Sequence, residues 1–135
     1  MAEDELKRTL RLFALAFGLV GISNFLKPLQ LGGAQTGFVF FGQRLTGTAN
    51  LIAGPLFGLY LLGYAWGIWN MRRFALPMGH VYATYVVLNL ILFYANNPLP
   101  PGIGYRAFAF IYTFVALGVA GGAAVLLTRH KEILT

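Results

Sequence analysis

Long apolar blocks alternate with short polar or basic segments along this chain, and four of the blocks are long. An α-helix needs about 20 predominantly apolar residues to cross the ~30 Å hydrocarbon core of a bilayer. The pattern therefore predicts four transmembrane helices, at approximately 9–26, 46–69, 74–95 and 105–128. The predicted fold class is an all-α integral membrane protein, a four-helix bundle with residues 1–135 in a single membrane domain.

Helix-breaking or charged residues delimit these blocks. The first block ends at Lys27 and Pro28, because proline disfavours helix in the residue before it. Arg72 and Arg73 lie between the second and third blocks, where the hydrocarbon core would be costly for them. The segment 98–104, with three prolines and two glycines, separates the third block from the fourth.

The segment 27–45 does not fit the pattern of a spanning helix. Two adjacent glycines, Gly32 and Gly33, break helix, and the apolar run 38–41 is too short to span. We expect an outer loop here, with residues 30–43 forming either a plain loop or an aromatic segment at the interface. A re-entrant half-helix is the alternative, since irregular backbone enters a membrane only when protein buries it or it lines water.

The basic residues give the four-helix topology an orientation. Seven lysines and arginines fall on one side of it and three on the other. Because cytoplasmic loops carry the excess of basic residues, both termini are predicted to be cytoplasmic, in a bacterial inner (plasma) membrane. The basic residues taken as topology signals are Arg72, Arg73, Arg129 and Lys131.

Composition supports a membrane location and narrows the possible chemistry. The chain is 58% hydrophobic and 10% charged, whereas soluble domains carry about 25% charged residues. A net charge of +6 would suggest nucleic acid in a soluble protein, but here the basic residues lie mainly at the ends of apolar blocks and are read as topology signals and phospholipid contacts. We predict no nucleic-acid partner. The absence of cysteine excludes disulfides and thiolate metal sites.

Small residues recur on the predicted helices at spacings that place them on common faces. Lipid removes most of the hydrophobic drive between helices, so small residues that let backbones approach become the main packing signal. They predict close packing within the bundle, and a homodimer seam would use the same signal. The residues assigned to packing are Gly54, Gly58, Gly63, Gly67, Gly79, Gly118 and Gly122.

A semi-polar stripe on the third predicted helix is the candidate ligand-binding feature. Tyr82, Tyr85 and Asn89 recur at spacings of three and four. Such polar groups usually hydrogen-bond between helices and fix their register. The alternative is a seam that contacts a small neutral or anionic solute. The residues assigned to such a seam are Asn50, Tyr82, Tyr85 and Asn89, with Arg44 and Arg106 on the outer side.

His80 is the only histidine within a predicted helix. Imidazole can ligate haem iron or the magnesium of a chlorophyll-type pigment, but a hydrogen-bonded structural histidine is the favoured interpretation. The carboxylates all lie near the two ends of the chain, so no predicted helix carries the acidic group that cation-coupled carriers use. No catalytic motif is present, and neither an enzyme nor a metal site is predicted.

The function expected from these features is that of a small accessory or structural subunit of a membrane complex, or of a homo-oligomer. A small channel or carrier that uses the Asn/Tyr seam is the first alternative. Haem or pigment binding through His80 is the second.

Overall fold

The computed structural model describes residues 2–26, 39–41, 43–44, 47–96 and 102–135, without the side chains of residues 39, 40, 44, 47 and 50. Nearly all of these residues are helical. The helices are α1 (Glu3–Phe25), α2 (Gly47–Trp69), α3 (Ala75–Asn96), α4 (Ile103–Arg129) and a short 3-10 helix (Lys131–Ile133), and two strands, β1 (Val39–Phe40) and β2 (Gln43–Arg44), lie between α1 and α2. The all-helical class is therefore confirmed, apart from this two-residue strand pair.

Three helices are long and apolar enough to cross a membrane: Leu51–Trp69 within α2, Ala75–Asn96 and Ile103–Arg129. The first helix is of similar length, but Arg8, Arg11 and Asn24 lower its mean hydropathy. Large apolar side chains cover much of the outer surface, as expected for a protein that faces lipid rather than water. The structure thus supports a membrane protein with three apolar helices.

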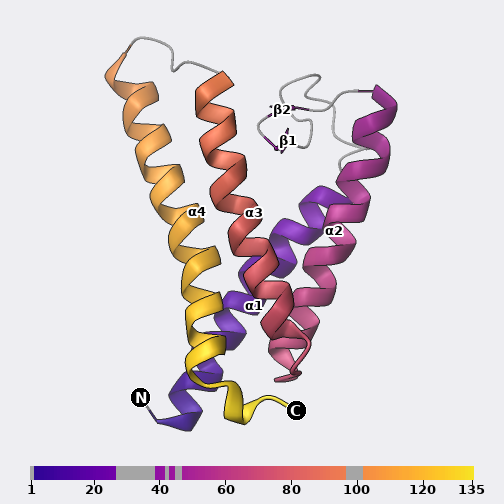
Figure 1. Cartoon of the computed structure of the whole chain (residues 1–135), viewed down its shortest axis with the longest axis vertical. Coiled ribbons are helices and arrows are strands. Elements are labelled where there is room, and N and C mark those ends of the chain that lie inside the picture. Colours follow the sequence, from indigo (N-terminus) through magenta and orange to yellow (C-terminus); the bar gives the residue numbers. More distant parts are fainter. Residues whose placement is uncertain (1, 27–38, 42, 45–46, 97–101) are drawn as a thin grey trace.

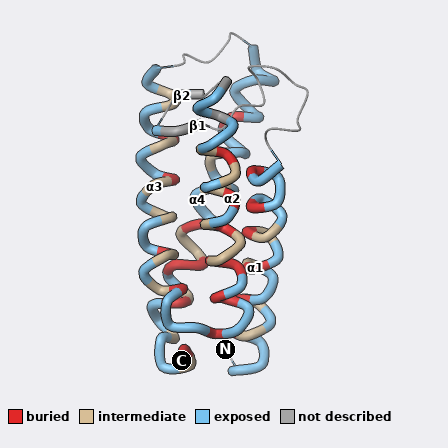
Figure 2. The backbone as a smooth tube through the Cα atoms, turned by 90° about the vertical axis from the view of Figure 1, so that its right-hand side faces the viewer, coloured by how far each residue is buried: buried red, intermediate tan, exposed pale blue. Residues whose placement is uncertain are grey.

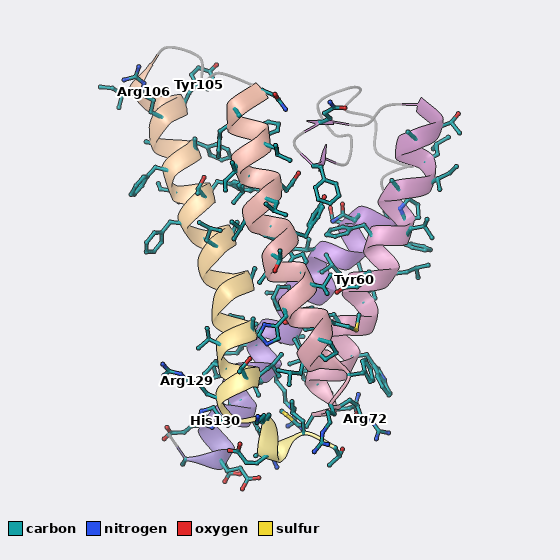
Figure 3. All side chains as sticks on the ribbon, viewed as in Figure 1. Tyr60, Arg72, Tyr105, Arg106, Arg129 and His130 are labelled. Carbon is teal, nitrogen blue, oxygen red and sulfur yellow. The ribbon has the colours of Figure 1, made fainter. Side chains whose placement is uncertain are left out.

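The helices form two pairs, α1 with α2 and α3 with α4 (Figure 1). The pairs meet at the end of the molecule that holds both chain ends and the α2–α3 corner, and α2 and α3 diverge toward the opposite end. We call these the basic end and the far end, because Arg72 and Arg129 lie at the first and Arg106 at the second (Figure 3).

The buried residues gather on the inner helix faces toward the basic end (Figure 2). On α1 the buried positions recur every three or four residues, which places them on one face of the helix. The largest fully buried side chains are Tyr64, Phe17, Leu10, Leu61, Ile68 and Leu127.

The segment that follows α4 closes the basic end of this core. Leu134 is buried against it. The backbone N–H of Thr135 donates to the carbonyl of Met71 (2.9 Å), and the N–H of Arg73 donates to the carbonyl of Thr135 (2.7 Å). These bonds satisfy backbone groups of the α2–α3 corner that no helix supplies with partners.

The first two helices cross where a glycine of each meets the other. A Cβ on Gly58 would lie 2.5 Å from the carbonyl oxygen of Gly21 and from the backbone nitrogen of Phe25. A Cβ on Gly21 would lie 3.0 Å from the carbonyl oxygen of Gly58. Since these neighbours are backbone atoms, the helices could accept a side chain at either position only by moving apart.

The other glycines assigned to packing differ in their surroundings. Gly54 is buried, Gly63 lies near the Met78 side chain, Gly67 lies against the ring of Phe74, Gly79 against Tyr64, and Gly122 near the ring of Phe13. Gly118 is exposed, and no described atom would lie within 4 Å of a Cβ placed on it. The packing role of Gly118 therefore stays a prediction, because this residue lies on the outer face of α4, where a homodimer seam would use the same signal.

Polar side chains connect α3 to α4 at two levels. His80 Nε2 lies 2.8 Å from the Thr128 hydroxyl near the basic end. Toward the far end the Thr113 hydroxyl donates to the Tyr94 hydroxyl over 3.0 Å. Hydrogen bonds of this kind between membrane helices contribute about 0.6 kcal/mol on average, so they fix the register of the pair more than its stability.

The described part of the segment 27–45 contains a short hairpin, which the sequence pattern did not predict. Strand β1 pairs with β2 in antiparallel register, Val39 with Arg44 and Phe40 with Gln43. Phe41, in the turn, has a positive φ of 46°. The pairing satisfies backbone groups that a single short segment would leave open. Residues 30–38 and 42 lie outside the described residues, so the prediction of a loop or re-entrant half-helix is not tested there.

We expect Gly58→Ala to destabilise the protein by about 1–3 kcal/mol, the usual cost of an overpacked contact. Unfolding in mixed micelles, followed by circular dichroism, measures the effect. Gly118→Ala is the matched control, because its Cβ meets no described atom and alanine improves helix propensity by up to ~1 kcal/mol. Equal effects of the two substitutions would contradict the close crossing.

Candidate functional site

A cavity of about 410 Å³ lies between α2 and α3, where the two helices begin to diverge. We call it the aromatic cavity. Five of its eight lining residues are aromatic, and the lining consists of Phe41, Ala53, Leu56, Phe57, Tyr60, Val81, Tyr82 and Tyr85. Its volume falls in the range of about 300–1,000 Å³ that is common for small-molecule sites.

Helical spacing places the lining residues side by side. Ala53, Phe57 and Tyr60 follow one another at steps of four and three on α2, and therefore share one face. On α3, Tyr82 and Tyr85 are three residues apart and share the face that looks toward α2. The hairpin adds Phe41 from the far end.

The aromatic rings contact one another around the cavity. The ring of Phe57 lies 5.5 Å from that of Tyr85 and 6.0 Å from that of Tyr82, measured between centroids. Phe41 meets Tyr85 edge-on, with the centroids 5.2 Å apart. Rings at these distances interact favourably beyond their area of contact, so the wall of the cavity is held together by its own side chains.

Two of the three hydroxyl groups in the wall, those of Tyr60 and Tyr85, have partners within the protein. The Tyr60 hydroxyl, between α2 and α3 in Figure 3, donates to the carbonyl of Met78 over 2.7 Å. A hydrogen bond joins the Tyr85 hydroxyl to the main chain of Phe41. No residue in the described lining is charged. The cavity therefore offers mainly ring faces and methyl groups, which favour an uncharged apolar molecule.

Tyr82 also borders a second cavity, of about 290 Å³, between α1, α3 and α4. Its ring meets that of Phe17 edge-on, with the centroids 5.4 Å apart. This cavity is lined by Ala16, Phe17, Val20, Tyr82, Tyr112, Val115, Ala116, Val119 and Ala120. The Tyr82 side chain thus contributes to the walls of both cavities.

Tyr64 lies in the core next to the aromatic cavity, and its hydroxyl has no hydrogen-bond partner among the described residues. The side chain is fully buried, with its ring 4.9 Å from that of Phe17. A Cβ on Gly79 would lie 2.5 Å from the Tyr64 hydroxyl oxygen. This oxygen can therefore pack against α3 only because residue 79 has no side chain. An unpaired buried hydroxyl destabilises a protein by about 1–3 kcal/mol.

The structure brings two of the six predicted ligand-binding residues to the aromatic cavity, Tyr82 and Tyr85. Asn89 is half-buried about one turn farther along α3 and has an interaction of its own, outside the lining. Arg106 is exposed at the far end of α4 (Figure 3). The backbone of Arg44 lies in β2 and that of Asn50 in α2, and the side chains of both lie outside the described residues.

The structure places His80 toward α4, away from the aromatic cavity. Its Nε2 atom is engaged with the Thr128 hydroxyl, which itself donates to the carbonyl of Ala124 over 2.7 Å. His130 lies beyond the end of α4, with Nδ1 3.8 Å from a carboxylate oxygen of Glu132. The described residues contain no group of three or more potential metal ligands. This geometry is that of a histidine that connects two helices.

Sequence reasoning missed Phe57, Tyr60 and Phe41 as lining residues. The first two carried a signal, because aromatic residues recur at 57, 60 and 64 with the spacing of one helix face. The same helix also carries several glycines, which are the stronger packing signal in its sequence. Phe41 carried no such signal, because its position depends on a hairpin that the sequence did not predict.

Tyr60, which is half-buried, and Tyr64, which is fully buried, give opposite predictions. Tyr60→Phe removes a hydrogen bond and is expected to lower the free energy of unfolding by about 1 kcal/mol. Tyr64→Phe removes a hydroxyl without a partner in the described residues and is expected to raise that free energy by about 1 kcal/mol. Denaturant titration in mixed micelles compares them. A loss of equal size in both variants would show that the Tyr64 hydroxyl is hydrogen-bonded.

Comparison with known proteins adds no functional assignment. The chain matches no protein-family model, no curated protein and no solved structure. The chemistry of its own residues is therefore the basis for inferring its function.

Proposed function

We propose that this protein binds a small, uncharged apolar molecule from the bilayer in the aromatic cavity between α2 and α3. The observation that supports this most directly is the cavity itself, with about 410 Å³ of space and aromatic residues from α2, α3 and the hairpin in its wall. An ordinary interface between membrane helices packs its side chains without such a space.

The chemistry of the wall indicates the class of ligand. Tyr60 and Tyr85 already use their hydroxyls within the protein, so of the three hydroxyl groups in the wall only that of Tyr82 remains for a guest. Ring faces favour flat aromatic or slim unsaturated molecules, whose contact with them is largely dispersive. Of the lining residues, Leu56 and Val81 are strongly exposed, which favours entry from the side that faces lipid.

We further propose that all four long helices span a bacterial inner membrane as a bundle, with both chain ends cytoplasmic. The basic end carries Arg72 and Arg73 from the α2–α3 corner and Arg129 and Lys131 from the end of α4. Both chain ends lie at the same end of the molecule as the α2–α3 corner (Figure 1). A chain whose two ends lie on the same side of a membrane must cross it an even number of times. The positive-inside bias then supports the cytoplasmic assignment.

The exposed half of α4 supports a second candidate, the accessory-subunit or homo-oligomer role that the sequence predicts. From 103 to 112, the only buried residue of this helix is Ala109. Phe108 and Phe110 are 71% and 73% exposed. A helix segment with so little of its own bundle around it has room for another membrane protein or a second copy of this chain.

Filling the aromatic cavity tests the binding proposal. We expect wild-type protein in mild detergent to retain a small neutral molecule, detected by native mass spectrometry. Ala53→Trp, within the wall, should reduce its occupancy at least tenfold, which corresponds to about 1.4 kcal/mol. Leu59→Trp, on an exposed face of α2, is the control and should retain it.

The same spectra report the mass of the assembly, and so bear separately on the accessory role. A ligand-free wild type, or equal occupancy in the two variants, would contradict the binding proposal. A higher-order assembly without a ligand would favour the second candidate instead. Circular dichroism of each variant establishes that the helices are intact.

Single engineered thiols test the topology, since the chain has no cysteine. In intact cells a membrane-impermeant maleimide is expected to label Gly104→Cys at the far end and not Asn70→Cys at the basic end. Permeabilised cells, in which both sites react, provide the control. Labelling of Asn70→Cys alone in intact cells would invert the orientation.

A further inference from the structure

A third cavity, of about 430 Å³, lies at the basic end between the first turns of α1 and the last turn of α2. We call it the basic pocket. Its walls are formed by Asp4, Lys7, Arg8, Arg11, Leu12, Leu15 and Trp69. We propose that the basic pocket binds one anionic phospholipid, with the phosphodiester at Arg8 and Arg11 and an acyl chain along Leu12 and Leu15.

One face of α1 supplies six of the seven lining residues. From Asp4 to Leu15 they follow at steps of three, one, three, one and three, which is the pattern of a single helix face. The face is divided along its length, with charge in the first two turns and leucine in the next. Arg11 and Leu15 are one turn apart, about 6 Å along the helix axis. A phospholipid has the same division between headgroup and chain.

The charges in the basic pocket leave two arginines open to a ligand. Lys7 Nζ lies 3.1 Å from a carboxylate oxygen of Glu3 and is therefore already paired. Within the described ranges, no carboxylate forms an ion pair with Arg8 or Arg11. Guanidinium groups donate paired hydrogen bonds in a geometry that matches phosphate oxygens.

Trp69 holds one of these arginines in place. The guanidinium carbon of Arg11 lies 5.2 Å from the centroid of the Trp69 ring. This cation–π contact connects α1 to α2 and reduces the freedom that a long side chain would lose on binding. Tryptophan is also the residue that prefers the level of the lipid headgroups.

The apolar part of the basic pocket favours a lipid over a free phosphate ion. Leu12, Leu15 and Trp69 are 62%, 54% and 42% exposed. A phosphate ion would leave these surfaces uncovered, whereas an acyl chain would cover them and gain the hydrophobic contribution. With Lys7 paired to Glu3, Arg8 and Arg11 remain against the single lining carboxylate of Asp4, and this excess of positive charge favours a headgroup with net negative charge over a zwitterionic one.

Fluorescence quenching by brominated lipids tests the proposal directly. The chain has two tryptophans, so Trp66→Phe leaves Trp69 as the only one. The full-length variant is placed in phosphatidylcholine vesicles that contain phosphatidylglycerol with brominated acyl chains. Bromine quenches at short range, so the signal reports lipid in contact with the Trp69 ring. We expect phosphatidylglycerol to be preferred over phosphatidylcholine brominated in the same way.

Charge-matched variants show whether the arginines of the basic pocket cause this preference. The double variant with Arg8→Gln and Arg11→Gln should lower the preference for phosphatidylglycerol by about fivefold for each arginine that is replaced. Arg106→Gln with Arg129→Gln removes the same charge elsewhere and should preserve it. Arg8→Lys with Arg11→Lys should recover part of it. Arg8→Gln alone keeps the Arg11–Trp69 contact, so a preference lost in that variant does not come from an altered tryptophan environment.

Several outcomes would overturn the proposal. One is an absence of preference in the parent variant, and another is equal losses in the two double-glutamine variants. Relief of quenching by excess inorganic phosphate would assign the site to a phosphate ion and not to a lipid. Equal quenching by brominated phosphatidylethanolamine would show that the net charge of the headgroup does not select the ligand.

Discussion

The rest of the structure depends on the close backbone contact between α1 and α2 at Gly21 and Gly58. Helices in lipid gain little from apolar contact alone, because the lipid is equally apolar, so they associate where their backbones can approach. Here a Cβ on Gly58 would lie 2.5 Å from backbone atoms of α1. This crossing fixes the tilt of α1 and places Phe17, one turn earlier, against Tyr64 of α2 and Tyr82 of α3.

At the basic end, Phe17 of α1 contacts Tyr64 of α2 and Tyr82 of α3 and so helps to join the α1–α2 pair to the α3–α4 pair. There the core is closed by Leu134 and by backbone bonds between Thr135 and the α2–α3 corner. Toward the far end α2 and α3 separate, and Tyr82, Tyr85 and the hairpin surround the aromatic cavity. The compact half of the molecule thus positions the more open half.

The two proposed sites use different chemistry and different residues. The aromatic cavity has an uncharged wall in which the Tyr60 and Tyr85 hydroxyls bond within the protein, and such a wall would favour apolar guests. The basic pocket combines exposed leucines with two arginines that form no ion pair with a described carboxylate, and therefore suits a molecule that is both anionic and apolar. Binding of lipid at the basic end would stabilise the α1–α2 crossing by mass action, since Arg11 and Trp69 lie on different helices.

The sequence by itself determined the positions of the helices, because the length of an apolar block and its charged or proline-containing ends are local properties. Predicted helices at 46–69 and 74–95 correspond closely to Gly47–Trp69 and Ala75–Asn96. Glycine spacing predicted close packing of the helices, but it did not specify that Gly58 would lie against Gly21 of α1. Only the tertiary structure decided that Tyr82 and Tyr85 face Phe57 and Tyr60 while Arg106 lies elsewhere. Which helix faces meet depends on where the helices cross, and no single helix encodes that.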